Sequence, residues 1–121
     1  MKPWNAAAAK RQLDRLWSEY IRRRDGHCTF CGRTEGKLDA NHIMSRRHTA
    51  TRWNTDNGNT LCFTCHRRFH DDPPWGVSEA ILLVGFDTYN ELLELSQKIK
   101  RFDRIMHECV KSELESKLKS L

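Results

Sequence analysis

Two pairs of cysteines with the same internal spacing are the chemically most informative feature of this sequence. Cys28 and Cys31 form the first CxxC pair, and Cys62 and Cys65 form the second. Each pair lets one turn of backbone direct two sulfurs at the same ion, so two pairs supply the four thiolates of a zinc site. Because four thiolates leave no open coordination position, this zinc is predicted to be structural. Its binding free energy becomes folding free energy for the segment between the pairs.

Histidine and asparagine side chains near the cysteines indicate a second kind of chemistry. His42 and Asn57 lie between the two cysteine pairs, and Asn41 directly precedes His42. His66 and His70 are four residues apart, so on a helix they share one face and can chelate a cation, although such pairs also occur on plain surfaces. These residue types together suit a catalytic metal and a general base. In a regular strand, however, Asn41 and His42 point to opposite faces.

The charge of the chain is unevenly distributed. The net charge is +5, but residues 1–70 carry 14 Lys and Arg against 6 Asp and Glu, whereas residues 71–121 carry 7 against 10. The basic part is the part that holds both cysteine pairs. A positive surface around a metal site favours a polyanionic partner, DNA, over a surplus that only aids solubility. The arginines predicted to hold the phosphate backbone are Arg46, Arg47, Arg52, Arg67 and Arg68.

Composition places limits on the fold and on the compartment. The chain has 121 residues, of which 38% are hydrophobic, so we expect one small domain whose core needs a staple. No apolar run approaches the roughly 20 residues of a membrane span. Residues 1–5 lack the apolar core of a secretory signal. The sequence therefore predicts a cytoplasmic protein, in which reduced thiols bind zinc and do not form disulfides.

Three segments are expected along the chain. Residues 1–26 predict an N-terminal helix, with Asn5 as its N-cap and Gly26 near its end. Residues 27–75 form a central module with the order strand, polar loop, strand and helix. Residues 76–121 predict a C-terminal helical extension.

The C-terminal extension carries an apolar stripe. From Asp87 onward, apolar residues recur every three or four positions, which predicts one long helix. The stripe favours packing on the body of a monomer. Pairing of two chains into a homodimer through the same face is the alternative.

The central module resembles the HNH endonuclease family, in particular the small zinc-containing HNH proteins of phages and prophages. Several spacings agree together: 15 residues separate His42 from Asn57, and 24 separate His42 from His66. The resemblance covers about residues 27–75. The segments that carry it are Leu38-Asp39-Ala40-Asn41-His42-Ile43, Asp56-Asn57 and Leu61-Cys62-Phe63-Thr64-Cys65-His66-Arg67-Arg68-Phe69-His70.

The resemblance implies an α+β fold, a ββα-metal finger with two strands and a helix around one divalent ion. The four-cysteine zinc knuckle belongs to this module, and helices flank it at both ends. By position, His42 is the general base that activates water, and Asn57 holds the loop and the base in place. His66 is a ligand of a catalytic Mg²⁺ or Mn²⁺, with His70 as a second candidate. Asn41 stands where the family often has Asp or His, and its neutral amide oxygen is a weaker ligand.

The sequence therefore predicts a metal-dependent DNA endonuclease with a structural zinc. A single site cuts one strand, so a monomer is expected to nick DNA and a dimer to cut both strands. Two alternatives stay open. One is a structure-specific phage nuclease that acts on branched DNA, and the other is a zinc-dependent DNA-binding module without catalysis.

Overall fold

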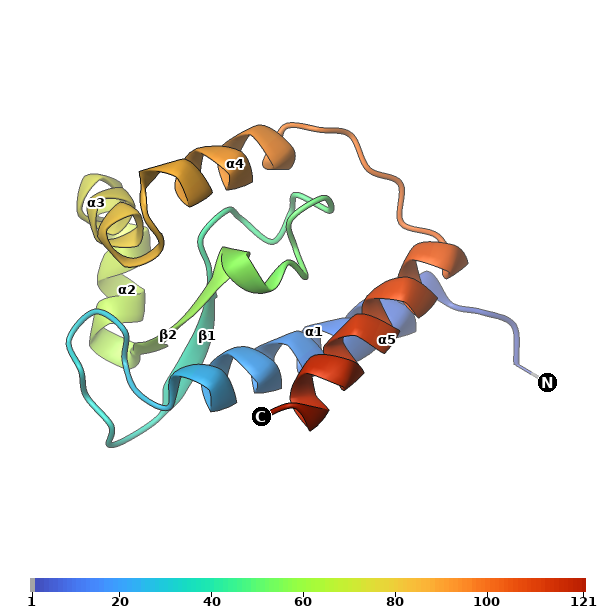
Figure 1. Ribbon diagram of the computed structural model, residues 1–121, viewed down its shortest axis with the longest axis horizontal. Helices are drawn as coiled ribbons and strands as arrows, with labels where there is room; N and C mark the ends of the chain where they lie inside the picture. Colours follow the sequence, from blue (N-terminus) through green and yellow to red (C-terminus); the bar gives the residue numbers. More distant parts are fainter. Residues whose placement is uncertain (1) are drawn as a thin grey trace.

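The computed structural model describes residues 2–121, which form five α-helices, one short 3-10 helix and a two-stranded antiparallel sheet (Figure 1). The elements in chain order are α1 (Ala6–Asp25), β1 (Leu38–His42), η1 (Thr55–Asn57), β2 (Gly58–Cys62), α2 (Phe63–Asp71), α3 (Pro73–Val84), α4 (Phe86–Ser96) and α5 (Arg104–Lys119). The strands and α2 form the predicted strand, strand, helix module, and helices flank it at both ends. The α+β fold class is therefore confirmed.

Helix α1 begins and ends where its capping residues predict. Asn5 Oδ1 accepts a hydrogen bond from Ala8 N at 3.0 Å, which satisfies one of the free N–H groups of the first turn. Gly26 ends the helix with a φ of 70°, in the left-handed region that favours glycine. The buried residues of α1 recur every four positions and face the rest of the protein; they are Ala9, Leu13, Trp17 and Ile21.

The two strands form the floor of the central module. In their antiparallel register, Asn41 lies opposite Asn59, and His42 lies opposite Gly58. All five residues of β2 are buried, because α1 and α2 both pack against the sheet. Strand β2 is thus an internal element, and its polar side chains need hydrogen-bond partners.

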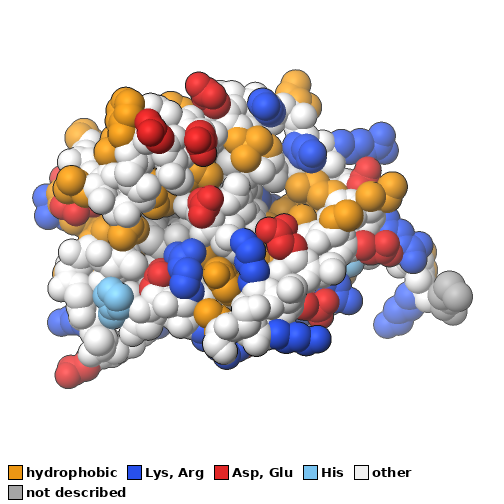
Figure 2. Space-filling model, viewed as in Figure 1, with side chains coloured by type: hydrophobic (Ala, Val, Ile, Leu, Met, Phe, Trp, Pro, Cys, Tyr) orange, Lys and Arg blue, Asp and Glu red, His pale blue; other side chains and the backbone are white. Residues whose placement is uncertain are grey.

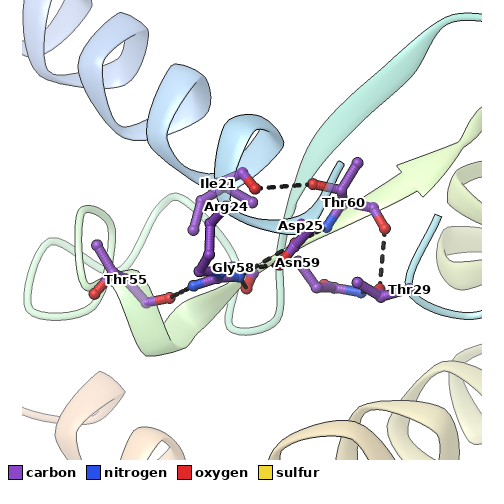
Figure 3. Close-up of polar contacts among 8 residues, drawn as sticks. All are labelled: Ile21, Arg24, Asp25, Thr29, Thr55, Gly58, Asn59 and Thr60. Atoms are coloured by element: carbon purple, nitrogen blue, oxygen red, sulfur yellow. Dashed lines mark hydrogen bonds and ion pairs between the residues drawn. The ribbon is translucent and has the colours of Figure 1, made fainter. Parts of the chain in front are cut away.

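Arg24 ties the end of α1 to the start of β2. Its Nη1 donates to Thr55 O and its Nη2 donates to Gly58 O, each at 2.8 Å (Figure 3). Its Nε lies 2.9 Å from Asp25 Oδ1, and Asp25 Oδ2 accepts from Thr60 N at 2.9 Å. The basic end of α1 is therefore partly used to fasten the helix to the sheet.

Gly58 allows α1 to approach the sheet closely. A Cβ atom at Gly58 would lie 2.4 Å from the Trp17 ring and 2.8 Å from Ile21. The backbone of Gly58 is extended, with a φ of −139°, so this position needs glycine for space and not for conformational freedom. Trp17 Nε1 also donates to Asn54 O at 3.0 Å, which fixes the ring over the bare backbone.

The predicted single long helix after Asp87 is wrong. Helix α4 ends at Ser96 and α5 begins at Arg104, with Asp103 as a new N-cap whose side chain accepts from Met106 N at 2.9 Å. The chain between them crosses from the α3–α4 side of the protein to α1, along which α5 packs (Figure 1). The break is favoured because it divides the apolar stripe between two separate cores.

These two cores lie on either side of the sheet module. The first contains Leu13, Trp17, Ile21, Trp53 and Leu114, with Phe102, Met106 and Val110 packed against it. The second contains Ile43, Met44, Ala80 and Leu92. The stripe of the C-terminal extension is thus used for packing within the chain. Helix α3 spans the predicted border between the central module and this extension. Within residues 2–121, no helix is both long enough and apolar enough to cross a membrane.

Replacing Gly58 by Ala should lower the free energy of unfolding by about 1–3 kcal/mol, because the added methyl group cannot fit beneath Trp17 without displacing α1. Urea denaturation measures this loss. In the double variant with Trp17→Leu, the smaller side chain makes room, so the combined cost should be less than the sum of the two single costs. Additive costs would show that the contact with Trp17 is not the reason for glycine at this position.

Candidate functional site

The four cysteines converge although they come from three places in the chain. Cys28 and Cys31 lie between α1 and β1, Cys62 ends β2, and Cys65 lies in the first turn of α2. Their sulfurs all lie within 4.8 Å of one another, and Cys31 Sγ is 3.7 Å from Cys62 Sγ. Sulfurs bound tetrahedrally to zinc at about 2.3 Å are about 3.8 Å apart. The cluster therefore fits zinc, and its sulfurs are too far apart for a disulfide, in which they are about 2.05 Å apart.

The electrostatics of the cluster also favour a cation. Burial raises the pKa of the Cys28 thiol, but backbone hydrogen bonds from its own knuckle and from Cys62 outweigh this effect and lower the pKa to about 6. Burial and the neighbouring sulfurs raise the pKa of Cys65. Four thiolates at this distance repel one another, so they ionise together only around a positive charge. The donor set thus suits a structural zinc.

The first cysteine knuckle is fastened to β2. Thr29 donates to Thr60 O twice, through its backbone N–H at 2.8 Å and through Oγ1 at 3.0 Å (Figure 3). Thr60 Oγ1 in turn donates to Ile21 O at 3.1 Å. Hydrogen bonds therefore join the first cysteine knuckle, β2 and the end of α1.

His42 is the last residue of β1, and its ring is held on two sides. The ring stacks on Trp17, with centroids 4.0 Å apart and planes inclined by 12°. Its Nε2 lies 2.9 Å from Arg52 O. A carbonyl oxygen only accepts, so Nε2 carries the proton and Nδ1 is the acceptor nitrogen. Desolvation lowers the pKa of His42 to about 4, so the ring is neutral at pH 7.

Asn57 is fully buried and fastens the loop that follows His42. Its Oδ1 accepts from Met44 N at 2.7 Å, and its Nδ2 donates to Met44 O at 3.0 Å. The same Nδ2 group donates to Thr51 O at 3.1 Å. Both ends of the loop are therefore attached to one side chain, and this loop delivers the carbonyl group that His42 contacts.

A cavity of about 460 Å³ opens beside His42. It is lined by Asn41, His66 and His70 as well, so the structure brings together the four residues predicted to act as base and metal ligands. Asn41 and His42 both line this cavity although they are adjacent in β1, so the alternation of the strand does not keep them apart. Further lining residues come from α1 and the loop; they include Asp14, Trp17, Ser18 and Arg46.

The Asn41 amide is buried and only half satisfied. The residue is 1% exposed, and its Nδ2 donates to Asn59 Oδ1 at 3.0 Å. Its Oδ1 has no hydrogen-bond partner within residues 2–121. A buried acceptor without a partner costs about 1–3 kcal/mol. A cation in the cavity would satisfy this oxygen, which is a suitable ligand for a hard divalent ion.

His66 and His70 face each other on α2, with ring centroids 5.1 Å apart. His66 Nδ1 lies 3.4 Å from Asp39 Oδ2, which leaves His66 Nε2 as the ring nitrogen available to a ligand. A carboxylate that contacts a metal-binding histidine in this way fixes the orientation of the ring. The donor set of one amide oxygen and two imidazoles therefore fits a divalent ion.

Arg52 does not have the free side chain that a phosphate contact needs. The side chain is 13% exposed, and its Nη2 lies 2.7 Å from Asp14 Oδ2. Trp53 Nε1 donates to Asp14 Oδ1 at 2.8 Å. Burial raises the pKa of Asp14, but these hydrogen bonds and the charge of Arg52 outweigh it and lower the pKa. Asp14 therefore anchors the end of the loop to α1.

Several residues of the site carry no chemical signal in the sequence. Trp17 sits at a core position of an amphipathic helix, and Asp14 is one charge among many on the same helix. Asn59 becomes relevant only through the strand register. Asp39 lies two positions before Asn41, so strand alternation would have placed both on one face.

Residues 28–72 match the family model of the HNH endonuclease family. The match begins at the first cysteine and ends just after α2, and it covers a little over a third of the chain. Over these residues, the central module is therefore similar to the HNH endonuclease family. The comparisons with curated proteins and with solved structures found no match.

The purified protein should contain about one zinc ion per chain, as expected for four thiolate ligands around one ion. Replacement of Cys65 by Ser should remove the zinc and unfold the central module. Cys109 provides the matched control, because it is exposed and lies outside the cluster. Cys109→Ser should change neither the zinc content nor the unfolding temperature. Elemental analysis and circular dichroism on the same samples decide the matter, and a folded protein without zinc would contradict the assignment.

Proposed function

We propose that the protein is a metal-dependent DNA endonuclease that hydrolyses phosphodiester bonds at the cavity beside His42. The observation that carries this proposal is the state of the His42 ring. Its Nε2–H is committed to the Arg52 carbonyl, its Nδ1 is left as an acceptor, and the ring is neutral at pH 7. A general base in hydrolysis needs an unprotonated nitrogen that is held in one orientation, and the hydrogen bond at Nε2 supplies this arrangement.

The reaction follows from the residues around the base. His42 Nδ1 takes a proton from a water molecule while the water oxygen attacks the phosphorus atom. The bond between phosphorus and the leaving sugar oxygen breaks. The stack on Trp17 and the bond to the Arg52 carbonyl keep the ring in one orientation, so little alignment is lost before proton transfer. Asn57 keeps the carbonyl-bearing loop in place.

Asn41, His66 and His70 would hold the divalent ion. When bound, such an ion polarises the scissile phosphate and stabilises the charge on the leaving oxygen. Two imidazoles and one neutral amide oxygen suit Mn²⁺ better than Mg²⁺, which prefers a shell of oxygen ligands. We therefore propose Mn²⁺ as the more effective activator.

Four of the predicted arginines form the proposed DNA surface around the cavity: Arg46, Arg47, Arg67 and Arg68. Arg46 lines the cavity, and its side chain is 66% exposed. Arg67 and Arg68 lie on α2 and make surface ion pairs with residues one turn ahead, at 3.5 and 3.6 Å, and the Arg68 guanidinium also lies 4.1 Å from the centroid of the Trp75 ring. Such pairs contribute little and can be exchanged for phosphate contacts.

The charge of the neighbouring elements supports this placement. A shallow concavity on α1 adjoins the cavity, and its lining includes Arg15, Arg22 and Arg23. In contrast, α4 carries Asp and Glu but no Lys or Arg, and acidic side chains gather over it in Figure 2. DNA therefore approaches the α1 and α2 side of the cavity and avoids α4.

A DNA-binding module without catalysis would need neither a desolvated histidine nor a buried oxygen without a partner, which is why the enzyme is favoured over it. A single catalytic site in each chain cuts one strand, so the expected product of a monomer is a nick. A zinc site of four thiolates needs reduced cysteines, so we propose that the protein acts in the reducing cytoplasm.

Replacement of His42 by Ala should slow the nicking of supercoiled plasmid in Mn²⁺ by a factor on the order of 10² or more, because the base acts in the transition state. The dissociation constant for DNA should stay nearly unchanged. His27→Ala is the control, because His27 is exposed and does not line the cavity. Chelation of the divalent ion should abolish nicking by the parent protein. If His42→Ala cuts as fast as the parent, the base is misassigned.

Arg47→Ala and Arg52→Ala should have different effects, although both remove one arginine. Arg47→Ala should weaken DNA binding and reduce its salt dependence by about one phosphate contact, with no loss of stability. Arg52→Ala should lower the free energy of unfolding by about 1–3 kcal/mol, because it leaves the carboxylate of Asp14 without its main partner. DNA titration at several salt concentrations and urea denaturation measure the two effects. If the Arg52→Ala protein is as stable as the parent but binds DNA less tightly, Arg52 belongs to the DNA surface.

A further inference from the structure

We infer that Thr29, a residue of the first cysteine knuckle, sets the orientation of the Asn41 amide through Asn59 and so couples the zinc cluster to the catalytic cavity. Thr29 and Asn59 are then positioning residues for the ligand oxygen of Asn41. The inference rests on the proposed function, because it concerns a residue proposed to bind the divalent ion.

A directed chain of hydrogen bonds leads from β2 to the cavity. Thr29 Oγ1 donates to Thr60 O at 3.0 Å (Figure 3). With its proton committed to that carbonyl, Thr29 Oγ1 accepts from Asn59 Nδ2 at 2.9 Å. Asn59 Oδ1 then accepts from Asn41 Nδ2 at 3.0 Å. Each step fixes the next one, because the first member of the chain is a backbone carbonyl that only accepts.

The direction of this chain matters because an amide side chain can be turned end for end with almost no change in shape. Asn41 and Asn59 lie opposite each other in the strand register and are 1% and 0% exposed. Two facing amides alone can pair with either polarity. If Asn41 were turned round, an NH₂ group would take the place of its free oxygen, and this group repels a cation. Thr29 removes the ambiguity.

This chain of hydrogen bonds leaves Asn41 Oδ1 without a partner, and this oxygen is the atom proposed to bind the divalent ion. Asn41 Oδ1 is the one buried side-chain nitrogen or oxygen of residues 2–121 that has no hydrogen-bond partner. The polarity set at Thr29 therefore ends in an oxygen on a residue that lines the cavity. Because Thr29 directly follows Cys28, the position of the Thr29 hydroxyl group in this chain of hydrogen bonds depends on the cysteine cluster.

The test compares Thr29→Val, which keeps the shape but removes Oγ1, with Thr29→Ser, which keeps the hydroxyl group. Calorimetric titration of zinc-loaded protein with Mn²⁺, without DNA, measures the affinity. Thr29→Val should weaken Mn²⁺ binding by about 10-fold or more, as is usual for residues that orient a metal ligand. Thr29→Ser should bind Mn²⁺ like the parent. Equal affinities for both variants would overturn the inference.

A second background separates orientation from a general structural effect. A carboxylate has oxygen at both ends, so in the Asn41→Asp background no wrong orientation exists. There, Thr29→Val should not weaken Mn²⁺ binding, because it only frees Asn59 to turn its NH₂ group toward the carboxylate. A loss as large as that in the parent background would mean that Thr29 acts by supporting the fold, and the inference would fail.

Further measurements keep the outcomes distinguishable. If Thr29→Val does not fold, hydrogen exchange of the Asn41 side-chain NH₂ in the parent protein replaces it: slow exchange supports the bond to Asn59, and fast exchange contradicts it. A parent protein that binds no Mn²⁺ at millimolar concentration overturns the proposed metal site together with this inference. A parent that binds Mn²⁺ with equal affinities in Thr29→Val and Thr29→Ser overturns the inference alone.

Discussion

The convergence of four cysteine sulfurs is the constraint on which the rest of the structure depends. The first pair precedes β1, Cys62 closes β2, and Cys65 lies in the first turn of α2, so one ion bound by all four would join the three elements of the central module. The chain has no large apolar core to do this instead, because its buried residues are divided among three small clusters. One of these clusters is built around Cys28 and Cys62 themselves, with Leu61 between the strands and the knuckle. Zinc bound at this cluster would therefore add its binding free energy to the folding free energy of the central module.

On this frame, the reactive groups are oriented almost entirely by neighbours from other elements. The His42 ring stacks on Trp17 of α1 and donates a hydrogen bond to a carbonyl group of the loop. Asn57 of η1 holds that loop in place. Asn41 is oriented across the sheet by Asn59. The same contacts that desolvate His42 and Asn41 also restrict the orientation of their side chains before any substrate arrives. Such preorganisation lowers the cost of aligning reactants in the transition state.

The residues that meet at the candidate site were predictable from the sequence to the extent that they have local signals in residue type and spacing. The cysteine pairs, His42, Asn57 and the histidines of α2 all have short-range signals, and the bounds of α1 follow from its capping residues. The long C-terminal helix was predicted wrongly, because a continuous apolar periodicity does not reveal that its two halves face different cores. The role of Arg52 was also beyond local patterns, since its partner Asp14 lies 38 residues away. Long-range pairing leaves no trace in the spacing of a single sequence.

The bare backbone of Gly58 has a consequence for how this module can be handled. Trp17 lies close to the Gly58 backbone and stacks on the His42 ring. A fragment that starts at the first cysteine would therefore lack the side chain that covers one face of this ring. Grafting residues 28–72 onto another scaffold would transfer the four cysteines and the proposed metal ligands, but the His42 ring would no longer be held by Trp17. Shuffling of such modules between proteins must therefore carry the preceding helix along, or supply a flat aromatic surface from the new host.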